Sequence, residues 1–355
     1  MKLFKCSHCG QLIYFENTHC EKCGLRLGFE TESLELFALK EENNDLFRIQ
    51  NKKTNQRYRY CSNYQYNVCN WLIPENNTSG FCRACELNRT IPDLSNSEYM
   101  QEWKTIETAK HRLVYSLLRM KLPLVSKTEN EETGLAFDFV ADTNLPKAEK
   151  ILTGHDNGLI TINIAEADDI KREMARKSMQ EVYRTVLGHF RHEIAHYYWE
   201  RLVAGTGRIQ MFRSLFGDER IDYAEALKIH YEQGSQNSWQ NNFISAYAST
   251  HPWEDWAETW AHYMHIVDTL ETAYAFGLSI DPVGSPASGN LQTEIKTDPY
   301  RVREFETIIQ SWLPLTFAMN SLNRSMGLND LYPFVISPPV IAKMKFIHTI
   351  IGDYK

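Results

Sequence analysis

The sequence contains a short motif of a kind that holds a catalytic metal ion, HEIAH at residues 192–196. On a helix, His192 and His196 project from one face about a turn apart, so their imidazole nitrogens can bind one zinc ion. Glu193 lies beside them, near enough to take a proton from a water molecule that such an ion activates. The apolar and aromatic flanks, GHFRHEIAHYYWERLV, predict a buried helix. Two buried histidines and a buried glutamate are costly unless a metal pairs with them.

A third ligand is expected from the segment HPWEDWAETWAHYMH at residues 251–265. Pro252 suits the first turn of a helix. Two carboxylates and two imidazoles flanked by tryptophans make a poor solvent face and a poor apolar core, so this stripe predicts a metal-binding face. The alternative is a polar network between packed helices. Four residues form the stripe: Glu254, Glu258, His262 and His265.

All 8 cysteines lie near the start of the chain, and their spacing predicts two structural zinc sites. The beginning of the sequence shows no export signal, so we expect a cytoplasmic protein whose thiols stay reduced. Clustered thiolates then bind zinc, the alternatives being disulfides or free thiols. The first set forms two CxxCG pairs, in which glycine allows the left-handed backbone of a zinc knuckle; the second set has knuckle spacing only in its last pair. The sets are Cys6, Cys9, Cys20 and Cys23, then Cys61, Cys69, Cys82 and Cys85.

The composition excludes several classes of protein. Hydrophobic residues make up 43% of the chain, enough for a packed core, and the net charge of −7 argues against a surface built throughout for nucleic acid. No apolar run is long enough to span a membrane, so no membrane contact is expected. Residues 47–59 hold five basic groups and no acid, so the zinc modules could contact a nucleic acid or a protein partner. A solvated loop is the alternative.

The elements that position the motif follow from the spacing of apolar side chains. An apolar face predicts a helix from about residue 99 to 120. Alternating apolar and polar residues predict strands at 134–142 and 158–168. Residues 172–203 contain no proline and predict one long helix or two abutting helices that carry HEIAH.

HEIAH followed by YASTHPWEDWAETW resembles the glutamate-zincin (gluzincin) metallopeptidases, and in local layout the catalytic domain of anthrax lethal factor. More widely, the chain resembles bacterial zinc-binding metallopeptidases with an N-terminal zinc ribbon. The shared features run from Cys6 to about residue 300 and include the CxxCG pairs, CNWLIP, RTIPDLS, LFGDERIDYAEAL and SAYASTHPWEDWAETWAHYMH. The resemblance implies that His192, His196 and Glu254 bind a catalytic zinc ion.

The same resemblance assigns roles to three further residues. Glu193 would be the general base, Tyr247 would stabilise the oxyanion, and Glu258 would orient a ligand imidazole. Glu254 follows His196 by 58 positions, a longer gap than in thermolysin-like enzymes, so an insertion is expected there. Rivals stay open for each role: Asp218 or Asp222 as the acidic ligand, His189 as a shifted histidine, and Tyr231 or Tyr263 as the oxyanion donor.

We therefore predict an α+β protein with one catalytic and two structural zinc ions. Its expected activity is hydrolysis of a peptide or protein substrate, and the strand at 158–168 is expected to be a sheet edge that receives an extended peptide. The alternatives are a zinc-ribbon protein that binds nucleic acid or a protein through a non-catalytic zincin scaffold, and a hydrolase of non-peptide amides. The predicted domains are a zinc ribbon (1–35), a second four-cysteine zinc module (36–95), a mainly helical zincin-like metallopeptidase domain with a small sheet (96–320) and a C-terminal extension (321–355).

Overall fold

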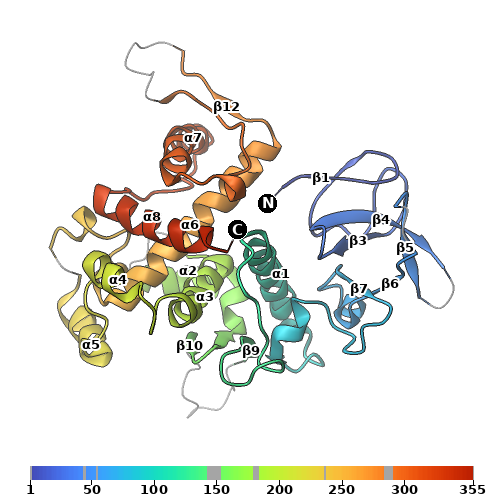
Figure 1. Ribbon diagram of the computed structural model, residues 1–355, viewed down its shortest axis with the longest axis horizontal. Coiled ribbons are helices and arrows are strands. Elements are labelled where there is room, and N and C mark those ends of the chain that lie inside the picture. The colour runs from blue at the N-terminus through green and yellow to red at the C-terminus, as the bar shows by residue number, and fades with distance from the viewer. Residues whose placement is uncertain are drawn as a thin grey trace. The chain divides into compact units, whose positions relative to one another are not determined.

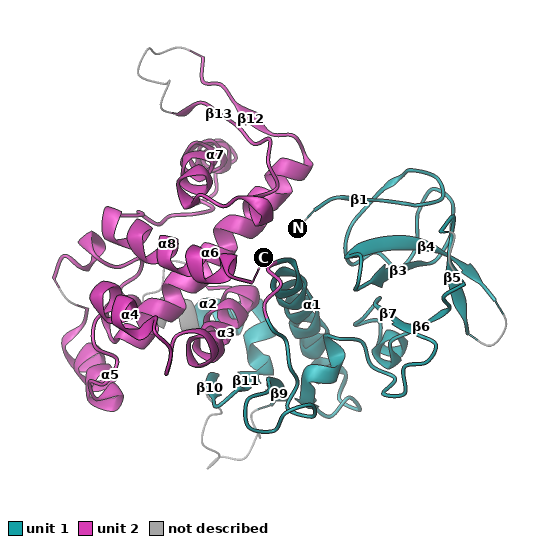
Figure 2. Ribbon diagram, in the orientation of Figure 1, with its two compact units in different colours: residues 1–119, 123–175 teal, residues 120–122, 176–355 magenta. Residues whose placement is uncertain are grey.

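The structure is a computed structural model that describes residues 2–42, 45–52, 55–141, 153–178, 184–235, 237–283 and 291–354. It mixes helices and sheets, as predicted, and most of its C-terminal half is helical (Figure 1). Two compact units divide the chain, one of residues 1–119 and 123–175 and the other of residues 120–122 and 176–355 (Figure 2). The predicted domain limits stay predictions.

The first unit begins with small β elements that surround both cysteine sets. Hairpin β1–β2 precedes a five-stranded antiparallel sheet in which β3 to β7 follow in chain order. Leu39, Phe47 and Leu72 are among the residues of its core. Phe15, Phe29 and Trp71 bring the two cysteine-containing segments together through ring contacts. The strands are β1 (Phe4–Lys5), β2 (Leu12–Ile13), β3 (Leu27–Glu30), β4 (Glu35–Glu41), β5 (Phe47–Ile49), β6 (Tyr58–Tyr60) and β7 (Leu72–Pro74).

The rest of the first unit combines the predicted helix with a small mixed sheet. Helix α1 (Ser97–Arg119) buries one apolar face, which confirms the helix expected at 99–120. Both predicted strands are present as β9 (Ala136–Val140) and β11 (Leu159–Asn163). The sheet has the order β10-β11-β9-β8, where β8 is Asn88–Thr90 and β10 is Gly154–Asp156.

The expected peptide-binding sheet edge is wrong for β11. Asn157 and Gly158, both with positive φ, form a two-residue turn that returns β10 along β11, while β9 pairs with its other side. This is the geometry that an Asn-Gly pair favours in hairpins. Both edges of β11 are therefore occupied by strands of the same sheet. Its Ile162 is 1% exposed, so it is a core residue of the sheet.

The second unit is built around two helices, α3 (Val186–Leu202) and α6 (Pro252–Ala275), which pack against each other. Trp256 on α6 donates its indole N–H to the carbonyl of Ala195 inside the HEIAH segment, at 2.8 Å. Trp260 stacks on Tyr198 with ring centroids 5.5 Å apart. Large buried aromatic side chains of this kind fix the spacing of the two helices, and hence of the polar residues between them.

Shorter helices complete the second unit. The predicted helical region 172–203 contains α3 and the end of α2 (Asp169–Ser178), with residues 179–183 outside the described part. Helix α8 packs on α6 and α4, so residues after 320 contribute to this core. Among the described residues, no helix is long and apolar enough to cross a membrane. The remaining elements are α4 (Ile209–Phe216), α5 (Tyr223–Gln233), η5 (Tyr247–Ser249), β12 (Ser279–Ile280), β13 (Thr293–Glu294), α7 (Phe305–Ser325) and α8 (Pro338–Gly352).

Candidate metal centres

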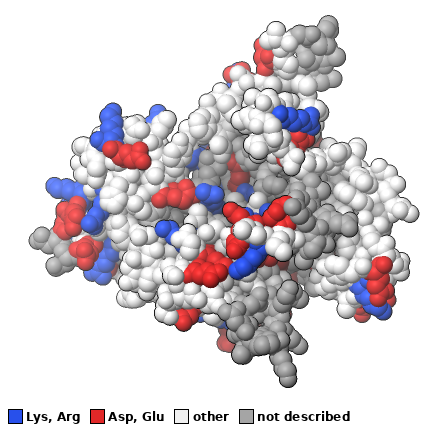
Figure 3. Space-filling view, turned by 180° about the vertical axis from the view of Figure 1, so that it is seen from behind, with Lys and Arg blue, Asp and Glu red and all other residues white. Residues whose placement is uncertain are grey.

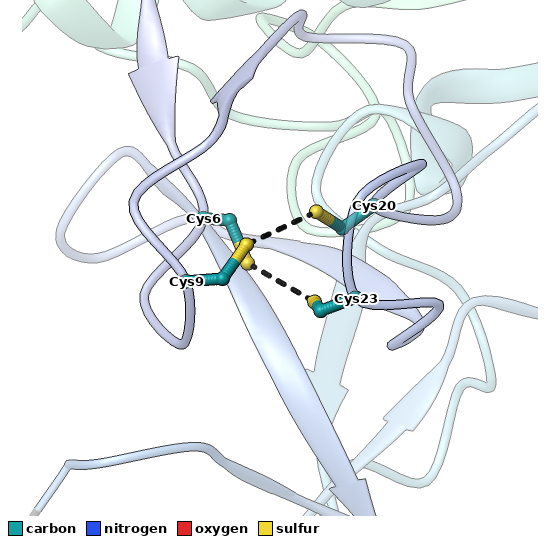
Figure 4. Close-up of side chains that lie close together, drawn as sticks. All are labelled: Cys6, Cys9, Cys20 and Cys23. Carbon is teal, nitrogen blue, oxygen red and sulfur yellow. Dashed lines mark hydrogen bonds between the residues drawn. The ribbon is translucent and has the colours of Figure 1, made fainter.

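The first four cysteines point their sulfur atoms at one another from two facing loops (Figure 4). The Sγ atoms of Cys6 and Cys23 are 3.8 Å apart, and those of Cys9 and Cys20 are 3.6 Å apart. A disulfide needs about 2.05 Å, whereas four thiolates at 2.3 Å from a tetrahedral zinc ion are separated by about 3.8 Å. Gly10 and Gly24 follow the pairs with φ of 73° and 72°, which confirms the knuckle backbone. The donor set fits zinc.

The second four cysteines also form one cluster, and this cluster is fully buried. Cys69 and Cys82 have sulfur atoms 3.7 Å apart, again the edge of a zinc–thiolate tetrahedron. The sulfur of Cys85 lies 3.6 Å from Nε2 of His111, which extends from α1. Local spacing gave a weaker signal here than for the first set, because only Cys82 and Cys85 have knuckle spacing.

The HEIAH histidines and Glu254 converge in the second unit. Their ligand atoms all lie within 4.8 Å of one another. Nε2 of His192 is 3.3 Å from Nε2 of His196 and 3.0 Å from Oε2 of Glu254. The second carboxylate oxygen, Oε1, is 3.7 Å from Nε2 of His196. Ligands at 2.0–2.1 Å from a tetrahedral zinc ion lie about 3.3 Å apart, so the two imidazoles and the Glu254 carboxylate lie at about the spacing of three zinc ligands.

The partners of these residues also fit a cation. Glu254 is 1% exposed, and its Oε2 accepts no hydrogen bond among the described residues although it faces His192. A buried carboxylate oxygen without a donor is costly unless a positive ion satisfies it. On the other side, His192 donates from Nδ1 to Oε1 of Glu258 at 2.8 Å, which leaves its Nε2 with a lone pair for a metal.

The electrostatics of the cluster point the same way. Burial lowers the pKa of His196 to about 4, so this imidazole is neutral and can act as a ligand. Burial raises the pKa of Glu254, but His196 and His192 outweigh that effect and hold the pKa at about 2. Burial likewise lowers the pKa of His192, yet Glu254 and Glu258 raise it well above its ordinary value. The two carboxylates thus favour a positive charge at this position.

Glu193 and Tyr247 lie at the edge of this cluster. Glu193 is half-buried, and burial raises its pKa to about 7, the range suited to taking and returning a proton near neutral pH. The ring of Tyr247 is 6.1 Å from the ring of His192, between centroids. Burial raises the pKa of Tyr247, so its hydroxyl stays a hydrogen-bond donor.

Two residues that contact these carboxylates were missed by the sequence analysis. Tyr223, at the start of α5, donates a hydrogen bond to Oε1 of Glu254 at 2.7 Å. Ser245 donates to Oε2 of Glu258, also at 2.7 Å. Tyr223 lies within FGDERIDYAEAL, a segment that the sequence marked for its aspartates. No local pattern indicates which hydroxyl reaches a carboxylate on another helix.

The rival ligands have other partners. Asp218 is paired with Arg220 at 2.6 Å, and Asp222 caps α5 by accepting from the amide of Glu225. His189 is not part of a metal-ligand group among the described residues. On the α6 stripe, Nδ1 of His262 lies 2.8 Å from the Tyr332 hydroxyl. His265 contacts the rings of Trp312 and Tyr332, so the predicted metal face ends at Glu258.

The rival oxyanion donors lie elsewhere too. Tyr263 is buried, and its hydroxyl lies 2.9 Å from Nδ1 of His348. Tyr231 is 68% exposed on α5. Of the three tyrosines, Tyr247 is therefore the one whose ring lies near that of His192.

Acids pair with several of the basic side chains of the segment 47–59. Arg48 pairs with Glu42 at 2.7 Å, and Arg57 pairs with Glu75 at 3.0 Å. Residues 53 and 54 lie outside the described part. On the face drawn in Figure 3, acidic and basic side chains of the described residues likewise lie next to one another in small groups. Such pairing leaves less net positive charge for nucleic acid than the sequence suggested.

Comparison with known proteins identifies the family of the chain. A family model described as "Putative zinc-binding metallo-peptidase" matches residues 99–350, more than half of the chain. The chain belongs to this zinc-binding metallopeptidase family. A second model, a zinc-ribbon domain, matches residues 3–96 of this metallopeptidase-family protein and covers both cysteine sets.

Relatives of this metallopeptidase-family protein occur in mycobacteria. Proteins from Mycobacterium tuberculosis and Mycobacterium bovis, each described as an uncharacterized protein, are 41% identical to it over 354 residues, covering 99% of this chain and 96% of theirs. No solved structure matches the chain.

Proposed function

We propose that this protein is a zinc-dependent metallopeptidase of the gluzincin type, with His192, His196 and Glu254 as ligands of the catalytic ion. The observation that carries the proposal is the convergence of those three ligand atoms at zinc-ligand spacing, with a carboxylate oxygen that otherwise has no donor. Two further zinc ions are assigned to the cysteine sets, which gives one catalytic and two structural ions.

The reaction assigns a task to each residue around the ion. A zinc ion bound there supplies a Lewis acid that polarises the scissile carbonyl and makes water more acidic. Glu193 accepts the proton of the attacking water and passes it to the leaving amine, a role supported by its pKa of about 7, raised by burial. Tyr247 donates to the developing oxyanion. Glu258 holds the ring of His192 through Nδ1.

The proposed partner is a peptide or protein substrate. A binding role of the zinc modules toward nucleic acid has less support, because Arg48 and Arg57 pair with Glu42 and Glu75. The eight free thiols, arranged as two ligand sets, favour a reducing location such as the cytoplasm.

The test compares the wild-type protein with Glu193→Gln on a peptide library read by mass spectrometry, with bound zinc counted in both. Glu225→Gln, an exposed change on α5, is the matched control. We expect three zinc ions in all three proteins and cleavage in the wild type and control alone. Two zinc ions in the wild type, or no cleavage of any peptide by it, would favour the non-catalytic scaffold instead.

A further inference from the structure

The segment between the two parts of the zinc site does more than connect them. Glu254 follows His196 by 58 positions, and α4, α5 and η5 lie in this stretch. We propose that this insertion completes the metal centre, because Tyr223 and Ser245 position the two carboxylates that hold the ion and its histidine. The inference rests on the proposed zinc ligands His192, His196 and Glu254.

Each carboxylate of the site accepts a hydroxyl at one oxygen and faces His192 with the other. Glu254 receives the Tyr223 hydroxyl at Oε1, and its Oε2 faces Nε2 of His192 at 3.0 Å. Glu258 receives the Ser245 hydroxyl at Oε2, and its Oε1 accepts from Nδ1 of His192. His192 is thus placed between two carboxylates, and a hydroxyl from the insertion fixes the far oxygen of each.

This arrangement decides the orientation of the ligands before an ion arrives. A glutamate side chain has several rotamers, and ordering it on binding lowers the affinity. A hydroxyl that donates to one oxygen at 2.7 Å selects the rotamer in which the other oxygen of Glu254 points to the imidazoles. Hydrogen bonds to charged groups are among the stronger ones in proteins, so a donor of this kind has a measurable effect.

The donors are themselves held in place. Asp222 caps α5 immediately before Tyr223, accepting from the amide of Glu225 at 2.7 Å. His251, which caps α6, lies with Nε2 3.2 Å from the carbonyl of Ile221. The start of α5 is therefore tied to the start of the helix that carries Glu254.

Ser245 is fixed in a similar way. Its Oγ accepts from the amide of Ala248 in η5 at 3.0 Å while donating to Glu258. The carbonyl of Asn242, three residues earlier, accepts from Nζ of Lys343 on α8 at 2.7 Å. The insertion is thus anchored on both sides of the site.

Tyr223 also packs against the residues at the start of α6. Its ring lies 5.2 Å from that of His251 and 6.3 Å from that of Trp253, between centroids. Tyr223 is therefore a positioning residue, because its hydroxyl orients Glu254 from a fixed ring.

The experiment measures zinc binding by the full-length protein, with zinc itself as the probe. The variants are Tyr223→Phe, Ser245→Ala and Ser245→Thr, and Glu254→Ala identifies which of the bound ions belongs to this site. Tyr274→Phe, an exposed change on the last turn of α6, is the control. Affinity is obtained by chelator competition. The melting temperature is measured with and without this ion. In a second measurement, cobalt replaces zinc. The d–d bands that disappear in Glu254→Ala belong to this site and report its ligand geometry.

We expect Tyr223→Phe and Ser245→Ala to lower the zinc affinity of the site formed by His192, His196 and Glu254 about 10–100-fold, the magnitude usual for partners of metal ligands. Both variants should also alter the cobalt bands. Ser245→Thr keeps the hydroxyl and should restore binding. Without this ion, Tyr223→Phe and Ser245→Ala should melt at the same temperature as the wild type. Adding zinc should raise their melting temperature less than it raises that of the wild type.

Two results separate the ideas. If Tyr223→Phe and Ser245→Ala hold this ion as tightly as the wild type while Glu254→Ala loses it, the positioning role is wrong and the zinc site stands. If Glu254→Ala binds as many zinc ions as the wild type, the proposed catalytic site fails, and the positioning role fails with it.

Discussion

A buried ion pair next to Glu254, the proposed ligand, gives a quantitative test of how the C-terminal helix supports the site. Nζ of Lys343 on α8 lies 2.6 Å from Oδ2 of Asp255, with the two side chains 4% and 0% exposed. The same ammonium donates to the carbonyl of Asn242 at 2.7 Å and lies 4.5 Å from the centre of the Phe243 ring. Replacing Lys343 with Met keeps most of the volume and removes the charge.

The expected cost follows from burial. Breaking a buried pair by removing one partner costs about 3–5 kcal/mol, because the other group is left charged or must take up a proton. For a unit of this size, that lowers the melting temperature by about 6–20 °C. The matched control is Lys345→Met, two residues along α8, whose partner Glu306 is 52% exposed. An exposed pair of that kind contributes about 0–1 kcal/mol.

The loss should depend on pH. Burial raises the pKa of Asp255 to about 7 in the folded protein, although Lys343 opposes the shift. Because this folded-state pKa exceeds the unfolded value of about 3.9, the carboxyl favours the folded state at low pH, and that contribution disappears as pH rises through 7. Without Lys343 the carboxyl has no cation to offset its charge, so Lys343→Met should be more destabilising at pH 8 than at pH 5.

The assay is thermal and urea unfolding of zinc-loaded protein, followed by tryptophan fluorescence at both pH values. Adding Asp255→Asn to Lys343→Met should recover part of the loss, because no charge is then left buried. Equal destabilisation by Lys343→Met and Lys345→Met at pH 8 would refute the reasoning, since it would mean that the buried pair does not connect α8 to α6.

Three further predictions concern the metal centres and the modules around them. Glu258→Gln should lower the zinc affinity of the site at His192 and His196 about 10–100-fold in chelator competition, while Glu225→Gln should leave it unchanged. Equal affinities of the two variants would show that Glu258 does not orient His192. The side-chain amide of Asn70 donates to the carbonyls of Phe15 and Asn17 at 2.7 and 3.0 Å. Asn70→Ala removes this donor and should lower the free energy of unfolding in urea by about 1–3 kcal/mol. An unchanged unfolding midpoint would contradict this. Cys9 and Cys23 are half-exposed, whereas all four cysteines of the second set are buried. When a chelator removes the zinc, an alkylating reagent should therefore modify the first set before the second. Mass spectrometry that shows the reverse order would count against two separate sites.

Much of the local structure followed from spacing along the chain. The CxxCG pairs predict zinc knuckles because two residues between cysteines bring both sulfurs to one side of a tight turn, and Gly10 and Gly24 have the required positive φ. The pair His192 and His196 shares a helix face for the same kind of reason, since four residues make about one turn. These are short-range properties, so the sequence was sufficient for them.

Properties that depend on distant parts of the chain were harder to predict. The strand at 158–168 was identified, yet its edge position was wrong, because β10 and β9 occupy both of its sides. The stripe on α6 was correct as helix geometry, but His262 and His265 contact Tyr332 and Trp312 and do not join the cluster. Helical spacing gives the face of a residue, and only the neighbouring elements decide what that face meets.

The sequence by itself determined the donor types: thiolates in two sets of four, two imidazoles one turn apart, and a carboxylate-rich helix to meet them. Tertiary structure alone decided that Glu254 faces Nε2 of His192 and that hydroxyls of Tyr223 and Ser245 hold the carboxylates. The physical reason is that a hydrogen bond depends on ångström-scale placement of atoms. That placement is set by the packing of η5 against α6 and by the contacts of Tyr223 with His251 and Trp253, which no local pattern of residues encodes.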